Sequence, residues 1–101
     1  MEGSYPQAAV QPVTVERDGG EAVITFTVPL ESAYYVAGVS YRREGTDLRV
    51  AIDRCAIRTE CATMAKASRP LGDGRRTQVR VPFESGRILL VHADGEQQIH
   101  P

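Results

Sequence analysis

Short runs in which apolar and polar residues alternate recur along this chain, and most of them are bounded by Gly, Pro or Asp. A period of two is typical of β-strands that bury one face, so the pattern restricts the chain to folds built from strands. The clearest run covers 21–28, where Ala22, Ile24 and Phe26 face one way and Val23 and Thr25 face the other. Further predicted strands cover 10–16, 34–43, 46–54, 77–83, 88–91 and 97–100.

The choice of apolar residues supports the same fold class, because 11 Val and 5 Ile stand against 5 Leu. Side chains branched at Cβ pack well on a pleated sheet. We expect a flexible N-terminus over 1–9 and a single domain over 10–101, folded as an all-β, immunoglobulin-like sandwich of seven or eight short antiparallel strands. The alternative is a small, partly open β-barrel with a short helix near 57–67.

Charge and hydropathy exclude several classes of protein. The formal net charge is -1, whereas a dedicated nucleic-acid-binding domain is normally strongly basic. Hydrophobic residues make up 42% of the chain, too many for a disordered protein, and no apolar run is long enough to span a bilayer. No signal peptide is recognisable at the N-terminus. The protein is therefore expected in the periplasm or outside the cell, with a signal peptide removed, or else in the cytoplasm.

The two cysteines lie in a segment that allows two conformations. If 55–67 is helical, Ile57, Cys61 and Met64 recur at helical spacing and form one apolar face. Six helical steps would then separate Cys55 from Cys61 by about 9 Å along the axis, which is too far for a disulfide.

If the segment is a β-hairpin, Cys55 ends one strand and Cys61 begins the next across a five-residue loop. The register then places Cys55 opposite Cys61 and Asp53 opposite Thr63, and a disulfide fits this arrangement. Lys66 fits poorly in that register, because it falls on the apolar face of the pair. We prefer the hairpin, which implies an oxidising compartment and a bridge that staples a small core.

The same segment carries a local resemblance to a known family. The sequence TDLRVAIDRC at 46–55, followed by Cys61 after five residues, resembles the cysteine hairpin of the amino-terminal immunoglobulin-like domain of the membrane thiol:disulfide interchange reductase. In that family a pair of this spacing on adjacent strands passes electrons to periplasmic partners. The resemblance implies that Cys55 and Cys61 form a redox-active pair. The neighbouring charges bear on the same role, because Arg54 and Arg58 would favour a thiolate and Glu60 would oppose it.

Four other residues are candidates for contact with a protein partner. Alternation in 34–43 sets Tyr35 and Tyr41 on one face and Tyr34 on the other, so one of the two adjacent tyrosines is expected to be exposed. Arg76 and Arg80 fall on one exposed strand face, where they could bind an acidic partner.

No constellation of residues indicates catalysis, a metal or a cofactor. His92 and His100 share no ligand spacing with a Cys or carboxylate cluster, and His92 is expected to be a hydrogen-bonded strand residue. We therefore expect a non-enzymatic, extracytoplasmic interaction module with one structural disulfide and a protein partner. The alternative is a periplasmic thiol–disulfide exchange protein that uses Cys55 and Cys61.

Overall fold

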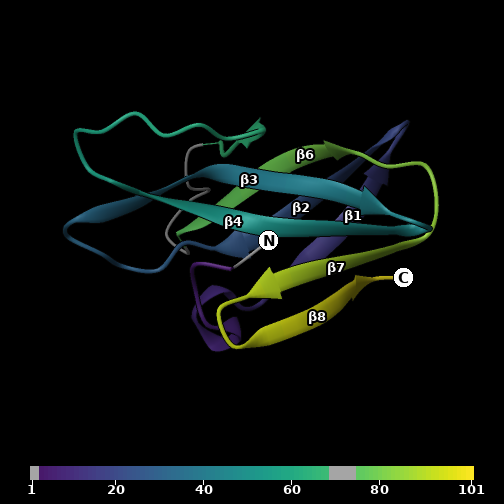
Figure 1. Cartoon of the computed structure of the whole chain (residues 1–101), viewed down its shortest axis with the longest axis horizontal. Coiled ribbons are helices and arrows are strands. Elements are labelled where there is room, and N and C mark those ends of the chain that lie inside the picture. Colours follow the sequence, from purple (N-terminus) through teal and green to yellow (C-terminus); the bar gives the residue numbers. More distant parts are fainter. Residues whose placement is uncertain (1–2, 69–74) are drawn as a thin grey trace.

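The computed structural model describes residues 3–68 and 75–101, which form two β-sheets packed face to face (Figure 1). The smaller sheet has the order β1-β2-β6 and the larger has the order β5-β3-β4-β7-β8. The strands are β1 (Thr14–Asp18), β2 (Glu21–Thr27), β3 (Tyr34–Glu44), β4 (Asp47–Ala56), β5 (Ala65–Lys66), β6 (Arg76–Pro82), β7 (Arg87–His92) and β8 (Gly95–His100). The prediction of an all-β sandwich is confirmed.

The alternative with a short helix near 57–67 is wrong. Within the described residues the only helical element is η1 (Gln7–Val10), a single 3-10 turn, and no strand pairing joins the two sheets into a barrel. Residues 57–64 contain no regular element. Alanines favour a helix here, but the tertiary contacts of the segment decide its path.

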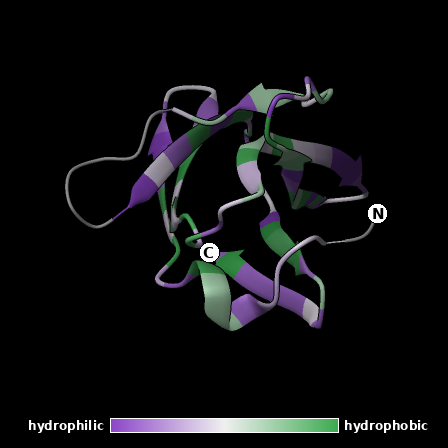
Figure 2. Ribbon diagram, turned by 90° about the vertical axis from the view of Figure 1, so that its left-hand side faces the viewer, coloured by the Kyte–Doolittle hydropathy of each residue, from purple (hydrophilic) through white to green (hydrophobic). Residues whose placement is uncertain are grey.

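The core lies between the two sheets and is built from the apolar positions of the alternating runs. Ile24 and Phe26 of β2 face Val50 of β4 and Leu90 of β7, and all four side chains are buried. Figure 2 shows hydrophobic and hydrophilic residues alternating along the strands. The predicted faces of β2, β4 and β6 are therefore confirmed.

One strand pair runs in an unexpected direction. β4 and β7 are parallel, with Leu48 beside Ile88 and Val50 beside Leu90, whereas all strands were expected to be antiparallel. Parallel neighbours need a long crossover connection, and here β5 and β6 lie between them in the sequence. Both faces of β7 are largely buried, as its continuous apolar run predicted.

A β-bulge changes the faces of β3. The register with β4 shifts between Val36 and Gly38, so Ala37 is an extra residue without a partner. Tyr35 consequently lies on the outer face beside Cys55, while Tyr41 packs against the core. The prediction that Tyr35 and Tyr41 share one face is wrong, because an inserted residue reverses the alternation before it.

The segment before Val10 packs on the sandwich from Gly3 onward, although 1–9 was expected to be a flexible terminus. Tyr5 is buried with the core residues, and its carbonyl accepts a hydrogen bond from the backbone N–H of Ala93 at 2.7 Å. An aromatic side chain within a polar segment gives the terminus enough apolar area to dock.

Candidate functional site

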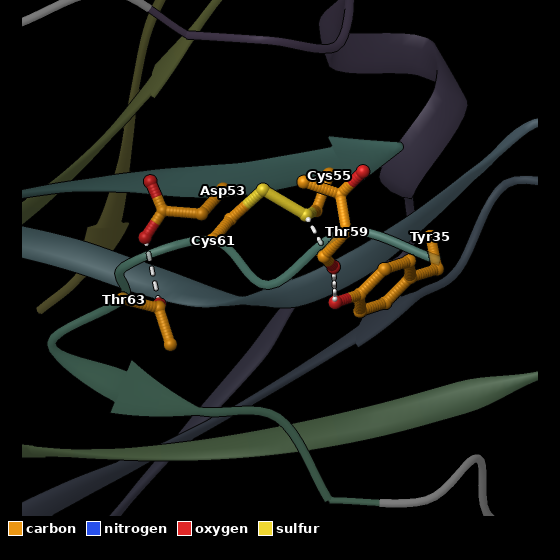
Figure 3. The surroundings of a disulfide bond; sticks show 6 residues. All are labelled: Tyr35, Asp53, Cys55, Thr59, Cys61 and Thr63. Carbon is orange, nitrogen blue, oxygen red and sulfur yellow. Dashed lines mark hydrogen bonds between the residues drawn. A yellow bond between two sulfur atoms is a disulfide. The ribbon is translucent and has the colours of Figure 1, made fainter. Parts of the chain in front are cut away.

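The two cysteines form a disulfide on the outer face of the larger sheet (Figure 3). The Cα atoms of Cys55 and Cys61 are 6.0 Å apart, within the usual range for a bridge. Cys55 is 1% exposed, while Cys61 lies in an exposed segment. The predicted pairing of the two cysteines is therefore confirmed.

The strand that follows the bridge does not form the predicted hairpin with β4. β5 pairs with β3 instead, where Lys66 lies opposite Gly38 and Ala65 opposite Val39. The cause is that β4 already has β3 on one side and β7 on the other, so it has no free edge. After Cys61 the chain must cross β3 to reach an open edge, and Lys66 avoids the apolar face it would have occupied in a hairpin.

A carboxylate on β4 holds this crossing segment, 57–64, to the sheet. Asp53 Oδ2 accepts a hydrogen bond from Thr63 Oγ1 at 2.7 Å (Figure 3). It accepts a second from Ser40 Oγ, also at 2.7 Å. Asp53 and Thr63 were predicted to be neighbours across a strand pair. They are neighbours, but through their side chains rather than through backbone pairing.

The loop between the cysteines is braced from β3. Tyr35 Oη donates a hydrogen bond to the carbonyl oxygen of Thr59 at 3.0 Å, and Cys55 Sγ lies 3.3 Å from the same oxygen (Figure 3). The sulfur contact is not a proton donation, because a bridged sulfur carries no hydrogen. Tyr35 therefore fixes the loop that the disulfide closes.

The end of the sandwich where β3 begins and β4 ends (Figure 1) also carries exposed apolar side chains. Leu30 is 82% exposed, Ile57 is 47% exposed, and Tyr34 and Tyr35 are each 40% exposed. The backbone N–H of Ile57 donates to the carbonyl of Ala33 at 3.0 Å, which joins the two loops. We call Leu30, Tyr34, Tyr35 and Ile57 the apolar tip.

A charged cluster supports the base of the apolar tip. The guanidinium of Arg54 lies 3.6 Å from the ring centroid of Tyr34, and its Nε donates to Glu31 at 2.9 Å. Tyr5 Oη donates to the same carboxylate at 2.5 Å. The hydrogen bond from Arg54 lowers the pKa of Glu31. The pKa of Tyr5 is raised, mainly because its side chain is buried and secondly because it donates a hydrogen bond to Glu31.

This cluster corrects one expectation about the cysteines. Arg54 was expected to favour a thiolate at the neighbouring Cys55, but its side chain binds Glu31 and Tyr34 on the opposite face of β4. Consecutive residues of a strand point to opposite faces. Lys66 lines an open pocket of about 350 Å³ together with Cys61 and Glu60, so a cation that was not among the expected ones shares a pocket with the exposed cysteine.

The structure places the other two candidate residues, Arg76 and Arg80, on β6 of the smaller sheet. The Nη1 of Arg76 donates to the carbonyl of Pro12 at 2.9 Å, and Arg80 forms ion pairs with Asp18 and Glu21 at 2.8 and 3.3 Å. Both arginines thus have partners within the chain. Their role in binding stays a prediction.

The remaining polar candidates have structural partners. Within 3–68 and 75–101, no group of three His, Cys, Asp or Glu residues is arranged to hold a metal ion. His92 is buried, and its Nε2 lies 2.8 Å from Gln97 Oε1, which confirms the prediction of a hydrogen-bonded strand histidine.

No helix in the described part of the chain is long and apolar enough to cross a membrane.

The chain matches no protein-family model, and comparison with curated proteins and with solved structures gives no match either. The resemblance of 46–55 and Cys61 to a thiol:disulfide interchange domain therefore stays a prediction.

Two residues of the apolar tip were missed in the sequence. Leu30 follows Pro29 after the strongest strand, and Ile57 sits between Ala56 and Arg58 in the loop between the cysteines. The available signal was the presence of a large aliphatic residue in each of two turn-rich segments. Alternation alone does not reveal it, because neither residue belongs to a strand.

Proposed function

We propose that this protein is a non-enzymatic, extracytoplasmic interaction module that binds a protein partner through the apolar tip. One observation carries the proposal. Four large apolar side chains are exposed at one end of the sandwich, where Tyr34 and Tyr35 begin β3 and the two connections that carry Leu30 and Ile57 are joined by a hydrogen bond. Exposed large apolar side chains at one end of a small domain favour an interface there, and tyrosine is a frequent anchor in interfaces.

The rigidity of the tip also favours binding. Tyr34 is held under Arg54, Tyr35 is held by Thr59, and the disulfide closes the loop that carries Ile57. Side chains that are ordered before binding lose less conformational entropy on association. The bridge therefore serves the interface by fixing one of its two loops.

The disulfide supports an extracytoplasmic location, because such bonds persist in oxidising compartments and are reduced in the cytosol. The location can be tested by trapping thiols with an alkylating reagent in acid-quenched cells. We expect Cys55 and Cys61 to be unmodified until a reductant is added. Two alkylated cysteines in freshly quenched cells would contradict the proposed compartment.

The interface can be tested by placing a photo-crosslinking amino acid at Ile57 or at Met64 in living cells. Met64 is a matched control, because it is 57% exposed but lies beyond the tip, beside β3. We expect a discrete protein adduct from position 57 that is absent from position 64 and is lost with Leu30→Ser. Identical adducts from both positions, or none from position 57, would reject the tip as the interface.

A second candidate function is thiol–disulfide exchange. It is favoured by the unequal accessibility of the two cysteines, with Cys61 on an open pocket and Cys55 buried. A dithiol of a partner would attack the bridge, form a mixed disulfide with Cys61 and release the thiolate of Cys55. The second partner thiol would then resolve the mixed disulfide, leaving the partner oxidised and this protein with two thiols.

The reduction potential of the bridge distinguishes the two functions. A potential below about -300 mV is expected for a structural disulfide, and this value supports the interaction module. A potential between about -270 and -120 mV, in the range of exchange proteins, would favour the second function.

A further inference from the structure

The outer edge of β6 carries backbone groups that can accept one more strand. β6 pairs with β2 on one side and ends the smaller sheet on the other. Val28 N–H donates to the Arg75 carbonyl at 2.7 Å at one end of this pair, and Phe83 N–H donates to the Gly20 carbonyl at 2.9 Å at the other. The register between them is unbroken, and direction alternates along an antiparallel pair. The even-numbered residues of β6 therefore direct their N–H and C=O groups away from β2.

The chain itself already uses one of these outward positions. Ser68 N–H donates to the carbonyl of Gln78 at 2.9 Å, and Gln78 N–H donates to Ser68 Oγ at 3.1 Å. The next outward position that has an N–H is Arg80, two residues further along β6. Within residues 3–68 and 75–101, no group bonds the outward backbone N–H or C=O of Arg80. An extended segment bound there would continue the line that Ser68 begins.

Two adjoining pockets provide room beside this position. An open pocket of about 470 Å³ is lined by Arg80 and Pro82 of β6 and by Tyr41 of β3. A pocket of about 370 Å³ adjoins it, because Tyr41 and Pro82 line both. Leu48 and Phe83 also line this second pocket and belong to the buried core, so it can accept an apolar side chain.

One charged group of the larger pocket has no partner. Glu21, Lys66 and Arg80 all line this pocket. Arg80 forms an ion pair with Glu21 at 3.3 Å, whereas Lys66 forms none within the described part of the chain. The pocket is therefore complementary to an acidic side chain.

We infer that the outer edge of β6 binds an extended segment of a partner protein as an added strand. One residue of the segment would bond the backbone of Arg80. Its neighbour would direct an apolar side chain between the sheets, as Val81 does, and an acidic residue would pair with Lys66. No residue of this site belongs to the apolar tip, so the inference goes beyond the proposed function.

The inference can be tested by titrating the isotope-labelled full chain with an end-blocked hexapeptide in which Leu alternates with Thr and Glu. We expect saturable backbone amide shifts in NMR at Gln78, Val81 and Leu48. The polar residues of the added strand would direct their N–H groups toward β6, and the leucines would direct theirs away. N-methylation of the polar residues should therefore weaken binding at least about ten-fold, and N-methylation of the leucines less than about three-fold. Equal binding of the two methylated peptides, or no saturable shifts with the unmethylated one, would overturn the proposal.

Two substitutions at Arg80 test the same bond from the protein side. Arg80→Pro removes the outward N–H without removing a bond to β2, and an edge strand tolerates proline. Arg80→Ala removes the side chain and its ion pairs with Asp18 and Glu21, but it keeps the N–H. The Pro variant should bind the hexapeptide at least about ten-fold more weakly than the Ala variant. Equal affinity would overturn the proposal, and the methylated peptides test it independently of how Arg80→Pro folds.

Three further results separate this site from other occupants. Lys66→Met should weaken binding about two- to five-fold, and Lys66→Arg should restore it. Leu30→Ser should leave hexapeptide binding at the wild-type level, whereas loss of binding would place the peptide on the apolar tip and overturn the proposal. Shifts at Gln78 and Val81 that depend on protein concentration in the absence of peptide would assign the edge to a second copy of the chain, with the same consequence.

Discussion

Gly38 of β3 lies directly beneath the carbonyl oxygen of Ala65, where the crossing segment reaches the edge of the sheet. A Cβ atom at position 38 would overlap that oxygen and would also lie 2.6 Å from Thr63 Oγ1. The crossing segment can approach the sheet this closely only because residue 38 has no side chain.

Replacing this glycine is therefore expected to destabilise the protein. Gly38→Ala should lower the free energy of unfolding by about 1–3 kcal/mol, because backbone must move to admit the methyl group. Urea denaturation monitored by circular dichroism measures the change. Gly20→Ala is the matched control, since nothing lies within 4 Å of a Cβ there, and its effect should stay below about 0.5 kcal/mol. Equal stability of the two variants would contradict the close packing of Ala65 on Gly38.

Removing the disulfide is expected to have a moderate effect on stability. The bridge closes a loop with a sequence separation of only 6, so Cys55→Ala with Cys61→Ala should cost about 2 kcal/mol by the chain-entropy model. The double variant should match the reduced wild-type protein in urea denaturation, because both lack the same cross-link. A double variant as stable as the oxidised wild type would show that the bridge does not stabilise the fold.

We expect the protein to lose stability at low pH because of Glu31, the carboxylate at the base of the apolar tip. The hydrogen bond from Arg54 lowers the pKa of Glu31 in the folded protein, so the unfolded chain binds the proton first as the pH falls. The stabilisation is complete well above the ordinary glutamate pKa and decreases progressively as the pH falls below about 5. Glu31→Gln should flatten this acid decline in thermal melts, whereas Glu16→Gln, an exposed control on β1, should keep the wild-type slope. An unchanged slope in Glu31→Gln would refute the prediction.

We also expect the protein to lose stability at high pH, because of Tyr5. Burial raises the pKa of Tyr5 in the folded protein, so above about pH 10 the unfolded chain loses the proton first and stability falls as the pH rises. Tyr5→Phe should flatten this decline. In an absorbance titration, one of the four tyrosines should ionise only when the protein unfolds. Four tyrosines that ionise together at the ordinary pKa would place Tyr5 in solvent rather than in the core.

The strands were predictable because their signal is local. Alternation assigned Ile24 and Phe26 to the core without knowledge of any partner strand. The bulge at Ala37 was not predictable, because nothing in the sequence of β3 distinguishes an inserted residue from a paired one. The face on which Tyr35 lies depends on that one residue.

The candidate site was predictable only in part. The spacing of Cys55 and Cys61 was enough to propose their bond, but the path of the chain after Cys61 depends on which strand edges are free. Which edges are free depends on β7, which pairs with β4 although it lies far away in the sequence. The apolar tip was missed for a related reason, since the connections that carry Leu30 and Ile57 are brought together in the fold, where Ile57 donates a hydrogen bond to Ala33.

The parallel pairing of β4 with β7 has a consequence for the speed of folding. The two strands cannot pair from a tight turn, because the connection between them includes β5 of the larger sheet and β6 of the smaller sheet. Closing such a long loop costs entropy before any contact compensates for it, and domains dominated by distant contacts fold in about milliseconds to seconds. We therefore expect the β3–β4 hairpin to form early, because its paired residues are close in sequence. We expect the pairing of β4 with β7 to form late and to limit the rate of folding.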